Sequence, residues 1–159
     1  SAVTRKVFKI AQDMTLSATI TVSTIPADCY LYGICVLGTG DILLTYSDFD
    51  TVNGVAIAAA SGLATATTHA VVLPAGEFFN FPFPGPDGNA YVPCYFQDDT
   101  ADVAKVTPAG SSTLIELTGS EDTGNSSFIG CVDGNGQVCI AMGGTTGVVQ
   151  PSVYKVDEA

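Results

Sequence analysis

The chain has 159 residues, of which 47% are hydrophobic and only 13% charged, and its formal net charge is −11. This length suits a single domain over residues 1–159 that can bury a core of its own. Sixteen acidic residues against five basic ones repel phosphate, which argues against nucleic acid as a partner and against binding to anionic membranes.

The N-terminal segment is the most basic part of the chain, because residues 1–10 contain Arg5, Lys6 and Lys9. We expect this segment to be either the first edge strand of the domain or a basic arm that docks on an acidic neighbour. No apolar segment follows these bases, so no signal peptide is visible. The uncharged run at 54–73 is made mostly of small residues, and no membrane span is expected.

The first half of the chain shows three strong strand patterns. Residues 15–24 alternate between polar and apolar side chains, which predicts a half-buried strand. Residues 29–37 are continuously apolar and predict a strand covered on both faces. Residues 41–46 follow a glycine-containing turn and predict the second strand of a hairpin. The alanine-rich segment 55–68 is compatible with one short helix or a flat strand.

Further short strands are predicted along the rest of the chain, at 70–73, 78–83, 90–96, 103–106, 113–118, 127–132, 137–142 and 148–156. About ten short strands with turns roughly every 8–12 residues are typical of a β-sandwich, a jelly roll or a small barrel. We therefore predict an all-β fold, an antiparallel and jelly-roll-like β-sandwich with at most one short helix.

Aromatic residues are concentrated in one region, at Phe78, Phe79, Phe81, Phe83, Tyr91, Tyr95 and Phe96. On a continuous strand the odd-numbered phenylalanines share one face, which we expect to pack into the core. Presentation of Phe78, Tyr91 or Tyr95 to a partner or a sugar ring is the alternative. The chain lacks Trp, the usual platform for sugars, which weakens that alternative.

Oxygen-rich loops are the candidate metal sites, and calcium is the one cofactor considered. The weak candidate ligands are Asp48, Asp50, Asp98, Asp99 and Asp102. Their spacing does not match a calcium-binding loop of the EF-hand type. Solvated acidic loops are the simpler interpretation.

Five cysteines are present, and none of them forms a C-x-x-C pair. Cys131 and Cys139 flank a glycine-rich segment, and a three-residue loop at 134–136 would place them directly opposite each other across a hairpin. They are therefore a candidate disulfide. Two small buried hydrophobic residues are the alternative.

No nucleophile elbow, phosphate-binding loop or dinucleotide-binding motif is present. The single histidine, His69, begins an apolar run, and a hydrogen-bonded histidine at a strand end explains it. A hydrolase centred on His69 or on a pair of acids is accordingly the least favoured of three hypotheses.

The leading hypothesis rests on several features together: the all-β pattern, a mostly neutral polar surface with few basic residues, the lack of a catalytic motif and the separate basic N-terminus. Sheet edges that carry few charges also need to be covered. We expect a non-enzymatic structural protein that forms a homo-oligomer, taken as a trimer, and docks on a larger protein assembly. A virion decoration, a fibre head or another component of a virion or extracellular surface would fit. An extracellular ligand-binding or carbohydrate-binding (adhesin) module is the second hypothesis.

Overall fold

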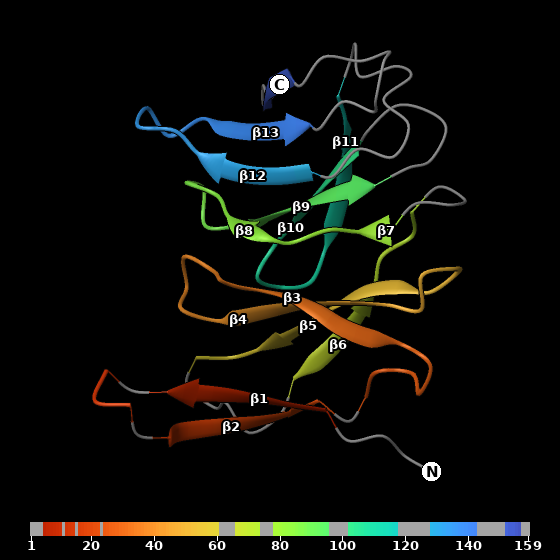
Figure 1. The fold of residues 1–159 in the computed structure, drawn as a ribbon, viewed down its shortest axis with the longest axis vertical. Helices are drawn as coiled ribbons and strands as arrows, with labels where there is room; N and C mark the ends of the chain where they lie inside the picture. The colour runs from red at the N-terminus through yellow and green to blue at the C-terminus, as the bar shows by residue number, and fades with distance from the viewer. Residues whose placement is uncertain are drawn as a thin grey trace.

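A computed structural model describes residues 5–10, 12–14, 16–22, 24–60, 66–73, 78–95, 102–117, 128–142 and 152–156. The regular secondary structure of these residues consists of β-strands alone, and all strand pairs are antiparallel. The strands form four sheets that follow one another along the chain (Figure 1). No helix in this part of the chain is long and apolar enough to cross a membrane.

Each sheet is built from strands that are consecutive along the chain. The first sheet contains β1 (Arg5–Ile10) and β2 (Leu16–Val22). The second contains β3 (Tyr30–Val36), β4 (Ile42–Ser47), β5 (Asn53–Ala58) and β6 (Thr67–Ala70). The third contains β7 (Phe78–Phe79), β8 (Phe83–Pro84), β9 (Ala90–Tyr95), β10 (Asp102–Val106) and β11 (Ser112–Glu116). The fourth contains β12 (Phe128–Val132), β13 (Val138–Met142) and β14 (Ser152–Val156).

The sheets pack face to face, and a separate apolar cluster fills each of the three spaces between them. Strand β4 shows why. Its side chains alternate between the two faces of the sheet, so Leu44 and Tyr46 enter the cluster shared with β2, while Leu43 enters the cluster shared with β9 and β10. Strands β4 and β5 are therefore buried on both faces. The all-β, antiparallel prediction is confirmed, and the sheets stack as in a β-sandwich but through four layers.

The same tight turn joins β3 to β4, β8 to β9 and β12 to β13. In each case a three-residue hairpin loop ends in a glycine with positive φ, at Gly40, Gly88 and Gly136. The turns begin at Leu37, Gly85 and Asp133, three positions that are equally spaced in the sequence. A fourth turn of this kind joins β10 to β11 and ends at Gly110. These loops match the common hairpin in which a type I turn is followed by a left-handed residue.

Several strand predictions need correction. A jelly-roll connection is not confirmed, because each sheet consists of strands that are consecutive along the chain. Neighbouring strands also follow one another in sequence, except that β7 pairs with β9. Strand β3, expected to be covered on both faces, is an edge strand with Tyr30, Ile34 and Val36 exposed. The strand expected at 78–83 is split into β7 and β8, because Pro82 between them has no amide hydrogen to donate to a ladder. Part of the alanine-rich segment forms β5 and β6, and residues 61–65 lie outside the described part of the chain.

Candidate docking surfaces

Among the described residues, the outer face of the fourth sheet exposes two large apolar side chains. Strand register places Ile129, Ala141 and Val153 in one row, and Cys131, Cys139 and Lys155 in the next. Ile129 is 67% exposed and Val153 is 69% exposed. We call these six residues the end face. The opposite face of the same sheet is buried in the cluster between the third and fourth sheets, through Val138, Ile140 and Val156.

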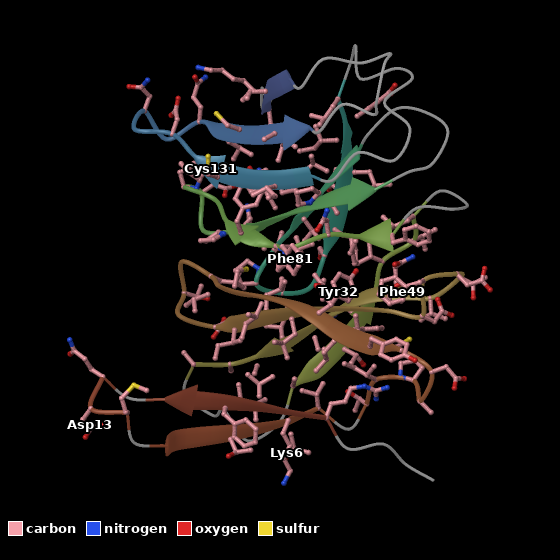
Figure 2. All side chains as sticks on the ribbon, in the orientation of Figure 1. Lys6, Asp13, Tyr32, Phe49, Phe81 and Cys131 are labelled. Carbon is pink, nitrogen blue, oxygen red and sulfur yellow. The ribbon has the colours of Figure 1, made fainter. Side chains whose placement is uncertain are left out.

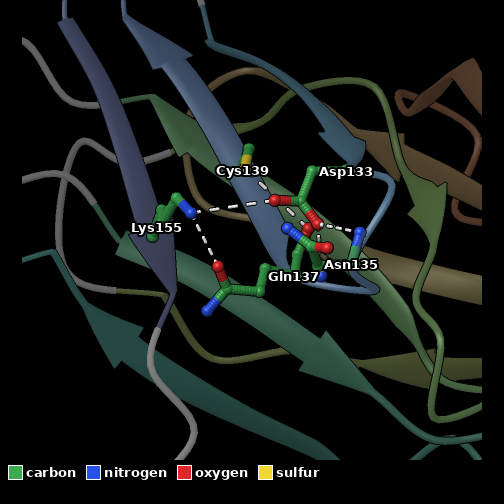
Figure 3. A network of polar contacts seen from close by, with 5 residues as sticks. All are labelled: Asp133, Asn135, Gln137, Cys139 and Lys155. Atoms are coloured by element: carbon green, nitrogen blue, oxygen red, sulfur yellow. Dashed lines mark hydrogen bonds and ion pairs between the residues drawn. The ribbon is translucent and has the colours of Figure 1, made fainter.

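The positive charge of Lys155 on the end face is paired with the carboxylate of Asp133 at the margin of the face (Figure 3). Lys155 Nζ lies 3.7 Å from Asp133 Oδ2 and 2.6 Å from Gln137 Oε1. Asp133 Oδ1 accepts hydrogen bonds from the backbone amides of Asn135 (2.8 Å) and Gln137 (2.9 Å). The amide of Gln137 is the main cause that lowers the pKa of Asp133, and Lys155 adds to it. Asp133 therefore stays ionised and neutralises Lys155.

The two cysteines of the end face lie directly opposite each other, as predicted. Cys131 pairs with Cys139 in the register of β12 and β13, and the connecting loop is the expected three-residue turn at 134–136. Both thiols are free in the structure. Cys131 is exposed and Cys139 half-buried, so the alternative of two buried hydrophobic residues is wrong.

A groove runs between the first and second sheets, along β1 and β3. It consists of three adjoining hollows of about 620, 250 and 380 Å³. The first two share Lys6 and Leu31, and the last two share Val7 and Ile34. Two of the predicted partner-binding residues, Arg5 and Lys6, line its basic end, and the side chain of Lys9 lies outside the described part.

Arg5 has a structural role in the wall of this groove. Its guanidinium donates hydrogen bonds to the carbonyl oxygens of Ala27, at 2.9 Å, and Cys29. These contacts tie β1 to the loop before β3. Lys6 is exposed, so it is the base in the groove that can meet a ligand. Residues 5–10 thus form a strand of the chain's own first sheet.

Tyr30, which lines the basic end of the groove, belongs to an aromatic cluster that includes Phe78. Figure 2 labels two of its members, Tyr32 and Phe49. The ring centroid of Phe49 is 6.0 Å from that of Tyr30, 5.6 Å from that of Tyr32 and 6.3 Å from that of Phe78. Phe49 has a positive φ of 62°, which is rare for a residue with a bulky side chain. The cluster was not predicted, because its members are distant in sequence.

The side chain of Asp48 holds the loop that carries Phe49. Asp48 Oδ1 accepts hydrogen bonds from the amides of Asp50, Thr51 and Val52. These bonds, that of Val52 first, lower the pKa of Asp48. The carboxylate predicted as a calcium ligand is therefore engaged with the backbone. In the segments that the structure describes, no group of three or more His, Cys, Asp or Glu residues could hold a metal ion.

The remaining predicted residues are not brought together. The ring of Tyr91 is fully buried and lies 6.0 Å from that of Phe83 within the core, so it is not presented to a partner. The side chains of Tyr95 and Asp102 lie outside the described part, as do Asp98 and Asp99. His69 lies on β6 and packs against Gly110, whose backbone leaves no room for a Cβ beside the imidazole.

No protein-family model matches the chain, and no curated protein is similar to it. Among the solved structures that share its fold are the following two. A protein of unknown function from Bacteroides caccae matches with a TM-score of 0.54 and 17% identity over 87% of this chain and 46% of its own. A GH43 glycoside hydrolase, engineered to display both endo-xylanase and exo-arabinofuranosidase activity, matches with a TM-score of 0.52 and 14% identity over 92% of this chain and 29% of its own. The chain spans less than half the length of either structure, and these likenesses show the fold alone.

Proposed function

We propose that this protein is a structural protein that assembles by packing its end face onto the end face of a second copy. One observation carries the proposal. The second sheet has neighbours on both sides and its central strands are buried on both faces, whereas the fourth sheet leaves Ile129 and Val153 about two-thirds exposed. Another sheet on this face would continue the stacking already repeated three times in the molecule.

Electrostatics favour a second copy at this position. The chain carries a net charge of −11, so most approaches between two copies are repulsive. On the end face the only charged side chain is Lys155, which is paired with Asp133. Two copies related by a two-fold axis can therefore meet there without opposing unpaired charges. Such a face forms a dimer, in place of the trimer expected from the sequence.

The size of the end face sets the strength of this contact. Covering Ile129 and Val153 contributes roughly 1–2 kcal/mol for each side chain. Three five-residue strands offer much less than the roughly 800 Å² per partner of a standard interface. We therefore expect a dimer that forms in the micromolar range. The larger surface on which it would dock, a virion or an extracellular layer, is a prediction from the sequence.

Sedimentation velocity of Val153→Asp tests this proposal. The substitution places one carboxylate from each copy in the apolar contact, so the variant should remain monomeric where the parent protein associates. Val72→Asp is the matched control, because Val72 is 87% exposed and lies outside the end face. Equal association of the parent and Val153→Asp would refute the proposed interface.

A hydrolase is the rival proposal, and its support is the fold shared with a GH43 glycoside hydrolase. Release of reducing ends from xylan, lost in His69→Ala, would favour it over assembly. The packing of His69 against Gly110 gives this residue a structural role, which makes it a weak candidate for catalysis.

A further inference from the structure

The groove between the first two sheets is bounded by two open strand edges. In the described segments β1 pairs only with β2, and β3 pairs only with β4. Figure 1 shows β1 and β3 one below the other, at the ends of their sheets. Open edges present unpaired backbone amides and carbonyls, which another extended chain can meet.

The hydrogen-bonding phase of β3 shows which backbone groups are available. The amide of Leu37 donates to the carbonyl of Asp41 at 2.8 Å. In an antiparallel pair the bonded positions alternate, so Cys35 and Gly33 also bond to β4. The amides and carbonyls of Ile34 and Val36 therefore point away from β4, toward the open edge.

The side chains along this edge are mainly aliphatic. Ile34 is 54% exposed, Val36 is 55% exposed, and Phe8 of β1 is 57% exposed. These three side chains line the third hollow of the groove, together with Val7. Among the described side chains, charged groups lie toward the other end, where Arg5, Lys6 and Asp28 line the first hollow.

We propose that this groove binds an extended peptide, which adds to β3 as an antiparallel strand at residues 33–36. Alternate aliphatic side chains of the peptide would contact Ile34, Val36 and Phe8. An acidic residue at its C-terminal end would reach Lys6, because an antiparallel strand runs from Val36 toward Tyr30. The register shift between Leu31 and Gly33 ends the regular edge there and sets the length of the added strand.

The lining of the groove favours a peptide over a saccharide. A sugar chain needs many polar side chains to bond its hydroxyls, whereas Arg5, Lys6 and Asp28 are the charged groups here and Arg5 already bonds two carbonyls. Backbone donors and acceptors at alternate residues match the spacing of another strand. This inference is independent of the end face, which lies at the opposite end of the stack.

The probe is a fluorescein-labelled peptide amide of sequence Val-Thr-Val-Thr-Val-Thr-Asp, in which the Asp side chain shares the face of the valines. It is titrated with the full chain by fluorescence anisotropy. Its second and third valines would lie opposite Val36 and Ile34, with their amides directed at β3. N-methylation of those two valines should weaken binding about tenfold or more, because each blocks a backbone hydrogen bond. N-methylation of the first two threonines, whose amides point away from β3, should change the affinity little.

Protein variants locate the site. Val36→Lys should weaken binding of the peptide, and Val72→Lys, at a surface position outside the groove, should not. Lys6→Gln should lower the affinity for the Asp peptide and leave that for its Asn analogue unchanged. The proposal is overturned if no peptide binds at millimolar protein, or if methylated valines bind as well as methylated threonines. It is also overturned if the groove binds something else, that is, if Val36→Lys abolishes the binding of cellohexaose or the association of two copies of the chain.

Discussion

Gly130 of β12 lies against the ring of Phe83 of β8, and the space between them is too small for a Cβ atom. This contact joins the third and fourth sheets and brings β12 close to the apolar cluster between them. Phe83 itself is buried and stacks on Tyr91. The position of the fourth sheet, and hence the direction of the end face, depends on the absence of a side chain at residue 130.

Gly130→Ala should therefore destabilise the protein by about 1–3 kcal/mol, because the added methyl group forces Phe83 or β12 to move. Urea unfolding followed by tyrosine fluorescence measures this change in free energy. Gly134→Ala is the matched control, since a Cβ at Gly134 meets no atom within 4 Å. Equal stabilities for the two variants would show that the fourth sheet does not pack on Phe83 as described.

The carboxylate of Asp133 predicts a specific dependence of stability on pH. Hydrogen bonds from the amides of Gln137 and Asn135 hold the pKa of Asp133 below its ordinary value of 3.8. A carboxyl group whose pKa is lower in the folded state stabilises the fold above the ordinary pKa, and this contribution is lost as the pH falls through the folded-state pKa.

We therefore expect Asp133→Asn to be less stable than the parent at pH 6, with the difference shrinking at pH 3. Urea unfolding at the two pH values measures it. Asp50→Asn is a suitable control, because Asp50 is an exposed acid in a different loop. A difference that is the same at both pH values would mean that the charge of Asp133 has no part in the turn.

The paired cysteines predict selective oxidation. Glutathione disulfide should oxidise the thiols of Cys131 and Cys139 to a disulfide, with two molecules of glutathione as the reduced product. Directly opposed residues in an antiparallel pair have the Cα spacing that a disulfide needs. Burial raises the pKa of Cys35 to about 12, so that thiol should stay unreactive.

Intact mass spectrometry should show the loss of two hydrogen atoms, and peptide mapping should place the bond between residues 131 and 139. Cys131→Ser should abolish it. Oxidation in which Cys35 or Cys94 reacts before Cys131 would contradict the burial seen in the structure.

The alternation of side chains was enough to predict most of the strands, and the turn between Cys131 and Cys139 was also predicted. The strand expected at 70–73 was wrong, because β6 ends at Ala70. Strand β2 is an example, because Ile20 and Val22 are buried on one face as expected. The repeat of three turns was not found, because it resides in backbone geometry at Gly40, Gly88 and Gly136 while the surrounding side chains differ.

The number of layers could not be read from the sequence either. A strand at an edge can be as apolar as a strand buried on both faces, as β3 and β5 show. The candidate surfaces depend on this difference. Ile34 and Val36 are exposed because β3 ends a sheet, and Ile129 and Val153 are exposed because β12 and β14 belong to the last sheet described.

The central claim is that two copies associate by covering apolar end faces whose charges are already paired. Light scattering of the parent protein at increasing concentration, in 0.15 M and in 1 M sodium chloride, tests it most directly. We predict a molar mass that rises from monomer toward dimer with concentration and is kept or increased at high salt, because salt screens the acidic surfaces and does not weaken apolar burial. A monomer at every concentration, or a dimer that dissociates in 1 M salt, would contradict the account.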